Sequence, residues 1–321
     1  MAATDSGADS MATVASLLAS MVQMYIEAPS ERKVSVSKEE EEEEGGALAV
    51  TMPKKMTFTS GVCGGLLVGK STLLRMCAEM ARQLDEEKNK LVRMYVSPEP
   101  IEEYKPFLER FYAATASEMR SSGLVLEFQM FVCAHQEACR RAFERHEAAL
   151  RRGGFEGVVW HLCERTSLDA LAVFMANSVK AGMATKLQLQ LLVAITANQW
   201  RPDHIVYLVA DKKVCEARHD RRNRDSEREM QMAYVHTIAD RYEQVFDEKH
   251  GLSKAIKDIF TGMPNRVFAE THAAFQWVDT VPISRIENNG NAEGDVPWEL
   301  LVGTIKSFSS TIMDSIRSCA E

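Results

Sequence analysis

Short apolar runs alternate with helical stretches through the middle of the chain. The runs are "MTFTSGV" (56–62), "LVRMYVS" (91–97), "GVVWHLC" (157–163), "HIVYLVA" (204–210) and "AFQWVDT" (274–280). Between the first two, apolar residues recur every three or four positions over 70–84, which is typical of a helix. Strands that alternate with helices form a parallel sheet with helices on both faces. The pattern therefore predicts an α/β fold with a five-stranded parallel sheet.

Three further segments have a helical pattern. Apolar positions over 124–150 and 167–198 predict two long helices that contribute to the core, and 301–316 has the spacing of a packed helix. The beginning of the chain differs, because six consecutive glutamates at 39–44 repel one another and cannot pack. We expect residues 1–54 to be a disordered N-terminal extension with an acidic run, and residues 55–321 to form one folded domain.

Composition excludes several classes of protein. The 321 residues have a net charge of −8, and the glutamate run accounts for most of it, so nucleic acid is not an expected partner. No apolar run approaches the roughly 18 residues of a membrane span, and the N-terminus lacks the basic start of a targeting signal. Seven scattered cysteines have no metal-binding spacing, which favours reduced thiols in the cytoplasm.

The stretch "GGLLVGKST" follows the first predicted strand and enters the first predicted helix. It matches the phosphate-loop pattern G-x4-G-K-S through Gly64, Gly69, Lys70 and Ser71, with Thr72 next. In such a loop, backbone N–H groups hold phosphate oxygens, the lysine adds a positive charge, and the serine hydroxyl ligates Mg²⁺. Leu67 is unusually bulky for this loop.

Ligands of a parallel sheet gather beyond the carboxyl ends of its strands. Glu99 follows the second predicted strand between two prolines and is a candidate general base. Glu164 and Arg165 end the third; an acid there resembles the position that helps to hold Mg²⁺, and the arginine could clamp a phosphate.

The segment after the fourth strand, "KKVCEARHDRRNRDSERE" (212–229), is rich in arginine. Arg218, Arg222 and Arg224 are spaced so that several guanidinium groups could converge on one polyphosphate. The segment therefore predicts an arginine-rich lid, although a solvated charged helix is the alternative interpretation.

The order and spacing of these motifs over about residues 55–250 resemble the deoxynucleoside kinases. This group includes deoxycytidine kinase, deoxyguanosine kinase, mitochondrial thymidine kinase and the insect multisubstrate enzyme, with relatives in some large DNA viruses. The family loop reads approximately G-N-I-x-x-G-K-S-T, from which Gly65 and Leu67 depart. The family motif E-P-V-x-x-W is similar to "EPIEEY", and E/D-R-S is similar to "ERT" (164–166).

The resemblance implies a P-loop kinase fold and the roles of particular residues. Glu99, Arg165 and Lys70 would be catalytic, Ser71 and Glu164 would hold Mg²⁺, and the lid arginines would contact the phosphates of ATP. The implied nucleoside-binding residues are Tyr104, which replaces the family tryptophan, Tyr112, Gln129, Gln136, Arg165, Ala170 and Glu227. Tyr112 and Glu227 would hold the sugar 3′-hydroxyl and Gln129 would read the base, although the gap between Tyr112 and Gln129 is some six residues longer than usual.

The implied activity is transfer of the γ-phosphate of ATP to the 5′-hydroxyl of a deoxynucleoside. Relatives that prefer deoxycytidine or purines have a charged Arg–Asp pair where this chain has Gln136 and Ala170. Its loss leaves room for a thymine methyl group, so thymidine is the first expected substrate and deoxycytidine the second. The resemblance also implies a homodimer, and a cytoplasmic location, in the host cell if the protein is viral.

Two alternatives remain open at this point. One is a P-loop kinase that acts on nucleotides, such as a thymidylate kinase. The other is a catalytically silent nucleotide-binding protein of the same fold, for which Leu67 is the main support. The joint presence of Lys70, Glu99, Arg165 and the lid arginines argues against a silent protein.

Overall fold

A five-stranded parallel sheet forms the centre of the molecule, as the sequence predicts. The computed structural model describes residues 57–86, 88, 90, 92–197, 199, 201–221, 230–247, 251–261 and 275–290. The strands are β1 (Thr57–Gly64), β2 (Val92–Ser97), β3 (Val158–Glu164), β4 (His204–Val209) and β5 (Ile283–Glu287), in the order β2-β3-β1-β4-β5. All four neighbouring pairs are parallel. The loops after β1 and β3 therefore emerge side by side at one edge.

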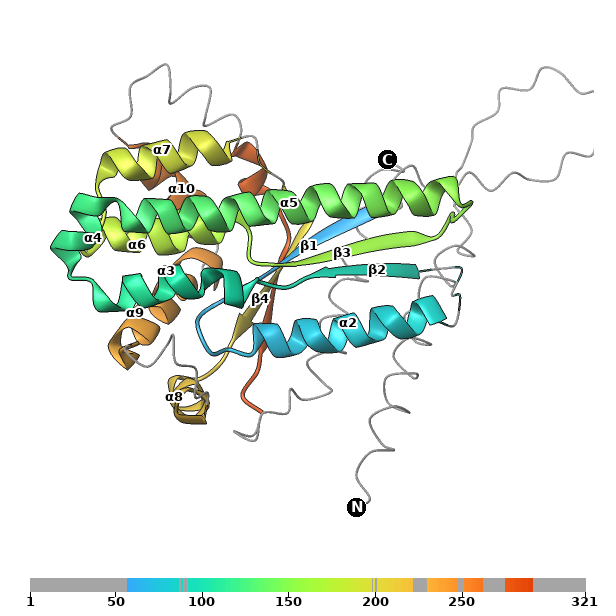
Figure 1. Ribbon diagram of the computed structural model, residues 1–321, viewed down its shortest axis with the longest axis horizontal. Coiled ribbons are helices and arrows are strands. Elements are labelled where there is room, and N and C mark those ends of the chain that lie inside the picture. Colours follow the sequence, from blue (N-terminus) through green and yellow to red (C-terminus); the bar gives the residue numbers. More distant parts are fainter. Residues whose placement is uncertain are drawn as a thin grey trace, which may run out of the picture.

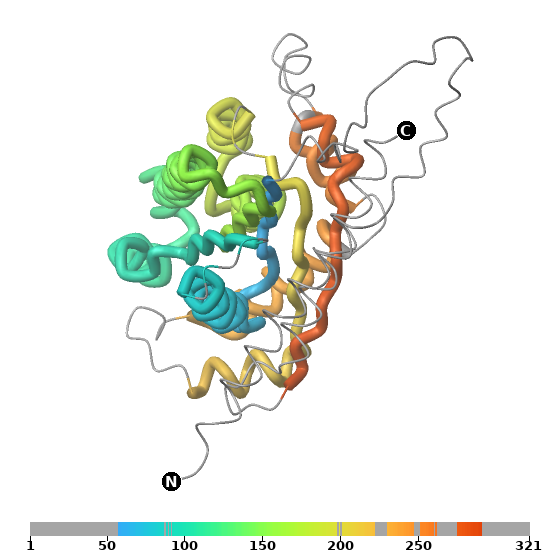
Figure 2. Tube along the Cα trace, turned by 90° about the vertical axis from the view of Figure 1, so that its right-hand side faces the viewer, coloured from blue at the N-terminus to red at the C-terminus, as the bar shows by residue number. Residues whose placement is uncertain are grey.

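Helices cover both faces of this sheet. They are α2 (Lys70–Glu86), α3 (Ile101–Ala113), α4 (Ala116–Ser122), α5 (Leu124–Arg152), the π-helix η1 (Asp169–Met175), α6 (Ala176–Lys180), α7 (Lys186–Thr196), α8 (Lys212–Arg221), α9 (Met232–Tyr242), the π-helix η3 (Glu243–Asp247), α10 (Gly251–Phe260) and the 3₁₀ helix η4 (Gln276–Asp279). In Figure 1, α2 lies below the strands and α5 and α7 lie above them. Strand β5, drawn in red in Figure 2, runs along the outer edge of the sheet.

Strand β4 demonstrates how the two faces acquire separate hydrophobic cores. All six of its residues are buried. Successive side chains of a strand point to opposite faces. Ile205 and Tyr207 accordingly pack in the core that contains α7 and α10, whereas Val206 and Leu208 pack with α2. Burial on both faces explains why this strand is an unbroken apolar run.

The fifth strand lies in a different segment from the predicted one. Within "AFQWVDT", residues 275–280 form a turn and the helix η4, and the buried Phe275, at the N-cap of this helix, is three positions before the buried Val278. That spacing places both side chains on one face of a 3₁₀ helix. The actual strand β5, "ISRIE", has only half-buried and exposed side chains because it lies at the sheet edge. Because its apolar pattern is weak, the sequence did not predict this segment as a strand.

Of the two predicted long helices, one is continuous and the other is interrupted. The predicted helix 124–150 is confirmed as α5, but the predicted helix 167–198 is interrupted between α6 and α7. Gly182 has a left-handed φ of 74° there, and a Thr185–Gln188 capping box starts α7. The long interval between Tyr112 and Gln129 contains α4, which has its own capping box.

Some predictions fall outside the described residues. These are the N-terminal extension 1–54, the C-terminal helix 301–316 and the lid segment 222–229. Among the helices of the described part of the chain, none is long and apolar enough to cross a membrane.

Candidate active site

The loop from β1 to α2 has a backbone that requires glycine at its two ends. Gly64 and Gly69 have φ values of 147° and 99°, which L-residues rarely adopt. A Cβ atom on Gly64 would lie 2.3 Å from the carbonyl oxygen of Leu208. Helix α2 begins directly after Gly69, whose carbonyl accepts hydrogen bonds from the N–H groups of Thr72 and Leu73. The predicted phosphate loop therefore has the required strand–loop–helix context.

Leu67 and Val68 anchor the loop. Both side chains are buried in the core on the α2 side of the sheet. Leu67 has a φ of 65°, a strained value for a residue with a side chain. Its carbonyl accepts a hydrogen bond from Arg218 at 3.1 Å, and the Val68 carbonyl accepts one from Asn288 Nδ2 at 2.8 Å. The bulky residues thus fix the loop to the core.

Asn288 is a site residue that the sequence analysis missed. It is fully buried directly after β5, and its own N–H bonds to the Val209 carbonyl at 2.7 Å. A Cβ on Gly69 would lie 2.4 Å from its Nδ2. The rule that site residues follow strand ends would have found Asn288 if β5 had been assigned correctly.

Lys70 is buried at the floor of the loop. Its Nζ donates to the carbonyls of Gly64 at 3.1 Å and Gly65 at 2.8 Å. Burial, and next the positive charge of Arg165, lower the pKa of Lys70 to about 8, although nearby carboxylates oppose this shift. An ammonium group that has lost its water can interact strongly with an incoming phosphate.

Ser71 and Glu164 bring two oxygen donors together. The Ser71 hydroxyl donates to Glu164 Oε1 at 3.2 Å, which joins the first turn of α2 to the last residue of β3. Glu164 Oε2 accepts a hydrogen bond from the Glu99 N–H at 3.2 Å. Burial and then the charge of Glu99 raise the pKa of Glu164. A hydroxyl and a buried carboxylate with excess negative charge beside it suit a hard cation such as Mg²⁺.

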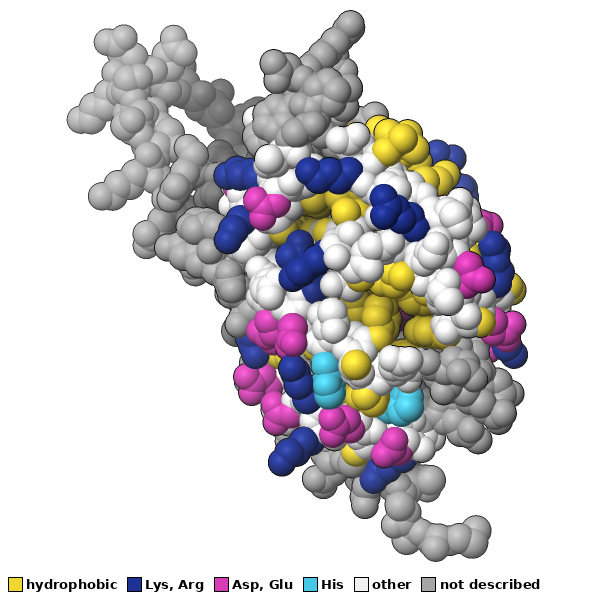
Figure 3. Space-filling model, turned by 90° about the vertical axis from the view of Figure 1, so that its left-hand side faces the viewer, with side chains coloured by type: hydrophobic (Ala, Val, Ile, Leu, Met, Phe, Trp, Pro, Cys, Tyr) yellow, Lys and Arg dark blue, Asp and Glu magenta, His cyan; other side chains and the backbone are white. Residues whose placement is uncertain are grey.

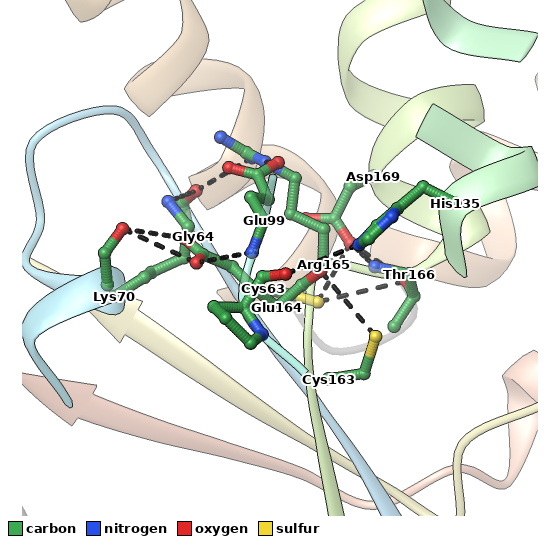
Figure 4. Close-up of polar contacts among 12 residues, drawn as sticks. Cys63, Gly64, Lys70, Glu99, His135, Cys163, Glu164, Arg165, Thr166 and Asp169 are labelled. Atoms are coloured by element: carbon green, nitrogen blue, oxygen red, sulfur yellow. Dashed lines mark hydrogen bonds and ion pairs between the residues drawn. The ribbon is translucent and has the colours of Figure 1, made fainter. Parts of the chain in front are cut away.

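Glu99, after β2, and Arg165, after β3, form an ion pair whose side chains are almost entirely buried. Arg165 Nε donates to Glu99 Oε1 at 2.5 Å (Figure 4). Arg165 turns back sharply after β3 with a φ of 65°, and its N–H bonds to the Val62 carbonyl at 2.9 Å. The turn brings Thr166 against Gly61, where a Cβ would lie 2.2 Å from the Thr166 methyl group. Backbone strain of this kind is often found at functional sites.

These groups line one cavity of about 470 Å³ at the carboxyl ends of the strands. One part of its lining has the loop and the cations Lys70, Arg75, Arg218 and Arg221. The remainder is largely aromatic and apolar, with Phe111, Phe128, Val132, Phe174 and Tyr234. Figure 3 faces this end of the molecule and shows hydrophobic side chains gathered in a hollow, with Lys and Arg side chains around it.

The structure brings most of the expected nucleoside-binding residues to this cavity. Tyr104, Tyr112, Gln129 and Ala170 all line it, together with Arg165. The Tyr112 hydroxyl lies 3.3 Å from Met230 Sδ. Among the expected residues that the structure describes, Gln136 is the exception, because it is buried two turns further along α5 and does not belong to the lining. Residues 136 and 170 therefore do not face the cavity as a pair.

The lid prediction has a mixed outcome. Arg218, in the last turn of α8, contacts the phosphate loop itself through Leu67, and its second NH group donates to the Asn288 carbonyl at 3.1 Å. Arg221 lines the cavity and is exposed. Arg222, Arg224 and Glu227 lie outside the described residues.

Comparison with known proteins identifies the family of the chain. The family model for deoxynucleoside kinases matches residues 61–289, which span the second half of β1, the phosphate loop, the cavity lining and the strands β2 to β5. The chain belongs to the deoxynucleoside kinase family, as the motif resemblance implied, and its fold is that of a P-loop kinase.

Among the solved structures similar to the chain are two of deoxyadenosine kinase from M. mycoides, one with the products dCMP and dCDP and the other with dCTP. The first is 18% identical with a TM-score of 0.44, and the second is 17% identical with a TM-score of 0.46. Each match covers 81% of this chain and 99% of the other. A search of curated proteins gave no significant match.

Proposed function

We propose that this protein transfers the γ-phosphate of ATP to the 5′-hydroxyl of a deoxynucleoside, with thymidine preferred and deoxycytidine second. The observation that carries this proposal is the continuous cavity that joins a phosphate loop to an aromatic pocket, with Glu99 and Arg165 in its lining. Phosphates need backbone N–H groups and cations, whereas a base needs apolar surfaces. The cavity offers both.

The nucleotide phosphates would lie against the loop residues 64–72. Gly64 and Gly69 allow the backbone to approach them, and Lys70 supplies a buried positive charge. Arg218, Arg222 and Arg224 would surround the transferred group. Because the charge of that group spreads over its equatorial oxygens, fixed cations stabilise the transition state more than the ground state.

Mg²⁺ would be held by Ser71 and Glu164. Within the described residues, no group of three or more His, Cys, Asp or Glu side chains could enclose a metal. This fits Mg²⁺, which usually retains waters and substrate phosphates and takes only one or two protein carboxylates. The bound ion would neutralise charge on the phosphates, and the protein would orient it through the Ser71–Glu164 contact.

Glu99 would accept the proton of the 5′-hydroxyl. Arg165 keeps the Glu99 carboxylate beside the loop, and Tyr104 and Tyr112 lie in the lining of the same cavity. In the aromatic part, Gln129 would pair with the edge of the base, since its amide offers a donor and an acceptor. The small Ala170 leaves space beside it, which supports a pocket that accepts the thymine methyl group.

We also propose a homodimer. Leu187, Leu191 and Ile195 are exposed at intervals of four residues along α7, and Met130 of α5 is exposed as well. An apolar stripe of this kind commonly marks a contact with another protein. A second copy of the chain is the partner that we propose for it.

Phosphorylation assays with ATP, Mg²⁺ and each of the four natural deoxynucleosides test the proposed activity. We expect thymidine to have the highest kcat/KM and deoxycytidine the next. The assay should include dTMP as an acceptor, because a nucleotide kinase would prefer it to thymidine. Preference for dTMP, or absence of turnover with all four nucleosides, would contradict the proposal.

A further inference from the structure

The guanidinium group of Arg165 is held on the side away from Glu99 as well. One of its NH groups donates to the Tyr242 hydroxyl at 2.6 Å, while Nε donates to Glu99. The group also lies over the Phe174 ring, 4.7 Å from the centroid. Tyr242, the last residue of α9, is thus connected to Glu99 through a single side chain.

Tyr242 is itself fixed by a buried carboxylate. Its hydroxyl donates to Asp169 Oδ1 at 2.5 Å, and both residues are fully buried. Asp169 Oδ2 accepts hydrogen bonds from the Thr166 N–H at 2.7 Å, the Thr166 hydroxyl at 2.9 Å and the Cys63 thiol at 3.0 Å. Figure 4 shows Asp169 beside Thr166, close to Arg165. The carboxylate therefore has little freedom to move.

Packing alone does not explain this arrangement. A buried carboxylate is expensive to desolvate, and apolar residues of similar size are often as stable. The polypeptide nevertheless places Asp169 where its negative charge acts on Arg165 through the hydroxyl of Tyr242. Hydrogen bonds to charged groups are stronger and more directional than neutral ones. The series of hydrogen bonds from Asp169 through Tyr242 therefore fixes the orientation in which Arg165 donates from Nε to Glu99.

We propose that Tyr242 and Asp169 are positioning residues for the proton acceptor Glu99, and that they act through Arg165. This inference rests on the proposed role of Glu99. Because a small misplacement of a reacting group can slow a reaction substantially, loss of the Tyr242 hydroxyl should affect the chemical step more than substrate binding.

The test is the single-turnover rate of nucleoside phosphorylation by Tyr242→Phe. We expect the rate to fall about 10-fold, with the KM values for ATP and thymidine little changed. Tyr207→Phe is the matched control, because Tyr207 is a buried tyrosine of the same core whose ring stacks on that of Tyr242. The control should keep the normal rate.

A double variant separates positioning from a general structural effect. If Tyr242 acts through Glu99, Glu99→Gln combined with Tyr242→Phe should be no slower than Glu99→Gln alone. If Tyr242→Phe does not fold, Asp169→Asn tests the same series of hydrogen bonds at the Asp169 end, with the same expected loss of rate.

The outcomes distinguish this inference from the proposed function. A normal rate for Tyr242→Phe, or losses that multiply in the double variant, would overturn the positioning role while Glu99 remained the base. A normal rate for Glu99→Gln would instead remove Glu99 from the proposed mechanism.

Discussion

The charge of each residue in the site depends on the residues that surround it. Glu99, Glu164 and Asp169 contribute three carboxylates to a buried cluster in which Lys70 and Arg165 are the cations. Burial by itself would lower the pKa of Arg165, but Glu99, Tyr242 and Asp169 outweigh it and raise that pKa. Arg165 therefore remains charged and can hold Glu99 in place.

The first prediction concerns Glu99. Glu99→Gln removes the proton acceptor but keeps the shape of the side chain, so kcat should fall by ~100-fold or more, whereas the KM of the nucleoside should change little. Steady-state kinetics at saturating ATP measures both. Glu103→Gln, at an exposed position of α3, is the control and should keep normal kinetics. Near-normal turnover of the Glu99 variant would exclude it as the base.

The second prediction concerns the pH dependence set by Lys70. Its pKa in the free protein is about 8, so the ammonium charge is present below that pH and is lost as the pH rises through it. Because kcat/KM reports groups of the free enzyme, kcat/KM for ATP should decline above pH 8. Bound phosphates favour the charged form, so kcat should decline only at higher pH. Identical profiles for the two parameters would contradict this assignment.

At the scale of the elements, pairs of strands are joined by buried histidines. His161 of β3 lies 2.9 Å from the Ser97 hydroxyl of β2, and His204 of β4 lies 2.9 Å from the Ser284 hydroxyl of β5. Burial lowers the pKa of His161 to about 3 and that of His204 to about 4. Both imidazoles are therefore neutral in the folded protein at neutral pH.

The third prediction follows from His161. Its folded pKa lies below the ordinary value of 6.5, so between pH 6.5 and about 3 the unfolded chain binds the proton more readily. The free energy of unfolding should thus decrease as the pH falls through this window, by about 2 kcal/mol at pH 5 from this residue. Urea unfolding at pH 7 and pH 5 measures the loss. His161→Gln should lose less stability than the natural protein over that interval, and an equal loss would refute the assignment.

The fourth prediction concerns the segment after α8. Arg222→Ala and Arg224→Ala should slow phosphoryl transfer about 10-fold or more in single turnovers, because their charge would serve the transition state. Arg141→Ala, at an exposed position of α5, is the control and should transfer phosphate normally. If both lid variants behave like the control, the segment is better interpreted as a solvated charged helix.

At the scale of the whole molecule, the sheet brings together the phosphate loop, Glu99, Glu164, Arg165 and Asn288. The ends of β1 and β3 are adjacent, which brings the phosphate loop to Glu164 and Arg165. The end of β2 adds Glu99 from the other side of β3, and β5 adds Asn288. Separate segments thus meet at one edge because all five strands run in the same direction.

The fifth prediction concerns association of two chains. Leu191→Lys places a charge in the exposed apolar stripe of α7 and should shift the protein from dimer to monomer in analytical ultracentrifugation. Lys186→Glu changes the charge of the same helix at an exposed position outside the stripe, and should leave the dimer intact. A natural protein that sediments as a monomer at all concentrations would exclude the proposed homodimer.

The sequence by itself determined those features that depend on neighbours along the chain. Four strands, the helices α2 and α5, and the phosphate loop were all predictable, because local apolar periodicity and glycine spacing specify them. Glu99, Glu164 and Arg165 could be selected because they lie at or just beyond the carboxyl ends of two predicted strands. The family resemblance then supplied roles for these residues, and the family match agrees with it.

Only the tertiary structure decided those features that depend on contacts between distant segments. An edge strand such as β5 buries few side chains, so its sequence carries a weak pattern, and Asn288 was missed with it. The anchoring of Leu67 and Val68, and the chain from Asp169 through Tyr242 to Arg165, join residues that are far apart in sequence. Their hydrogen bonds exist because the fold brings these groups together, and no local pattern encodes that proximity.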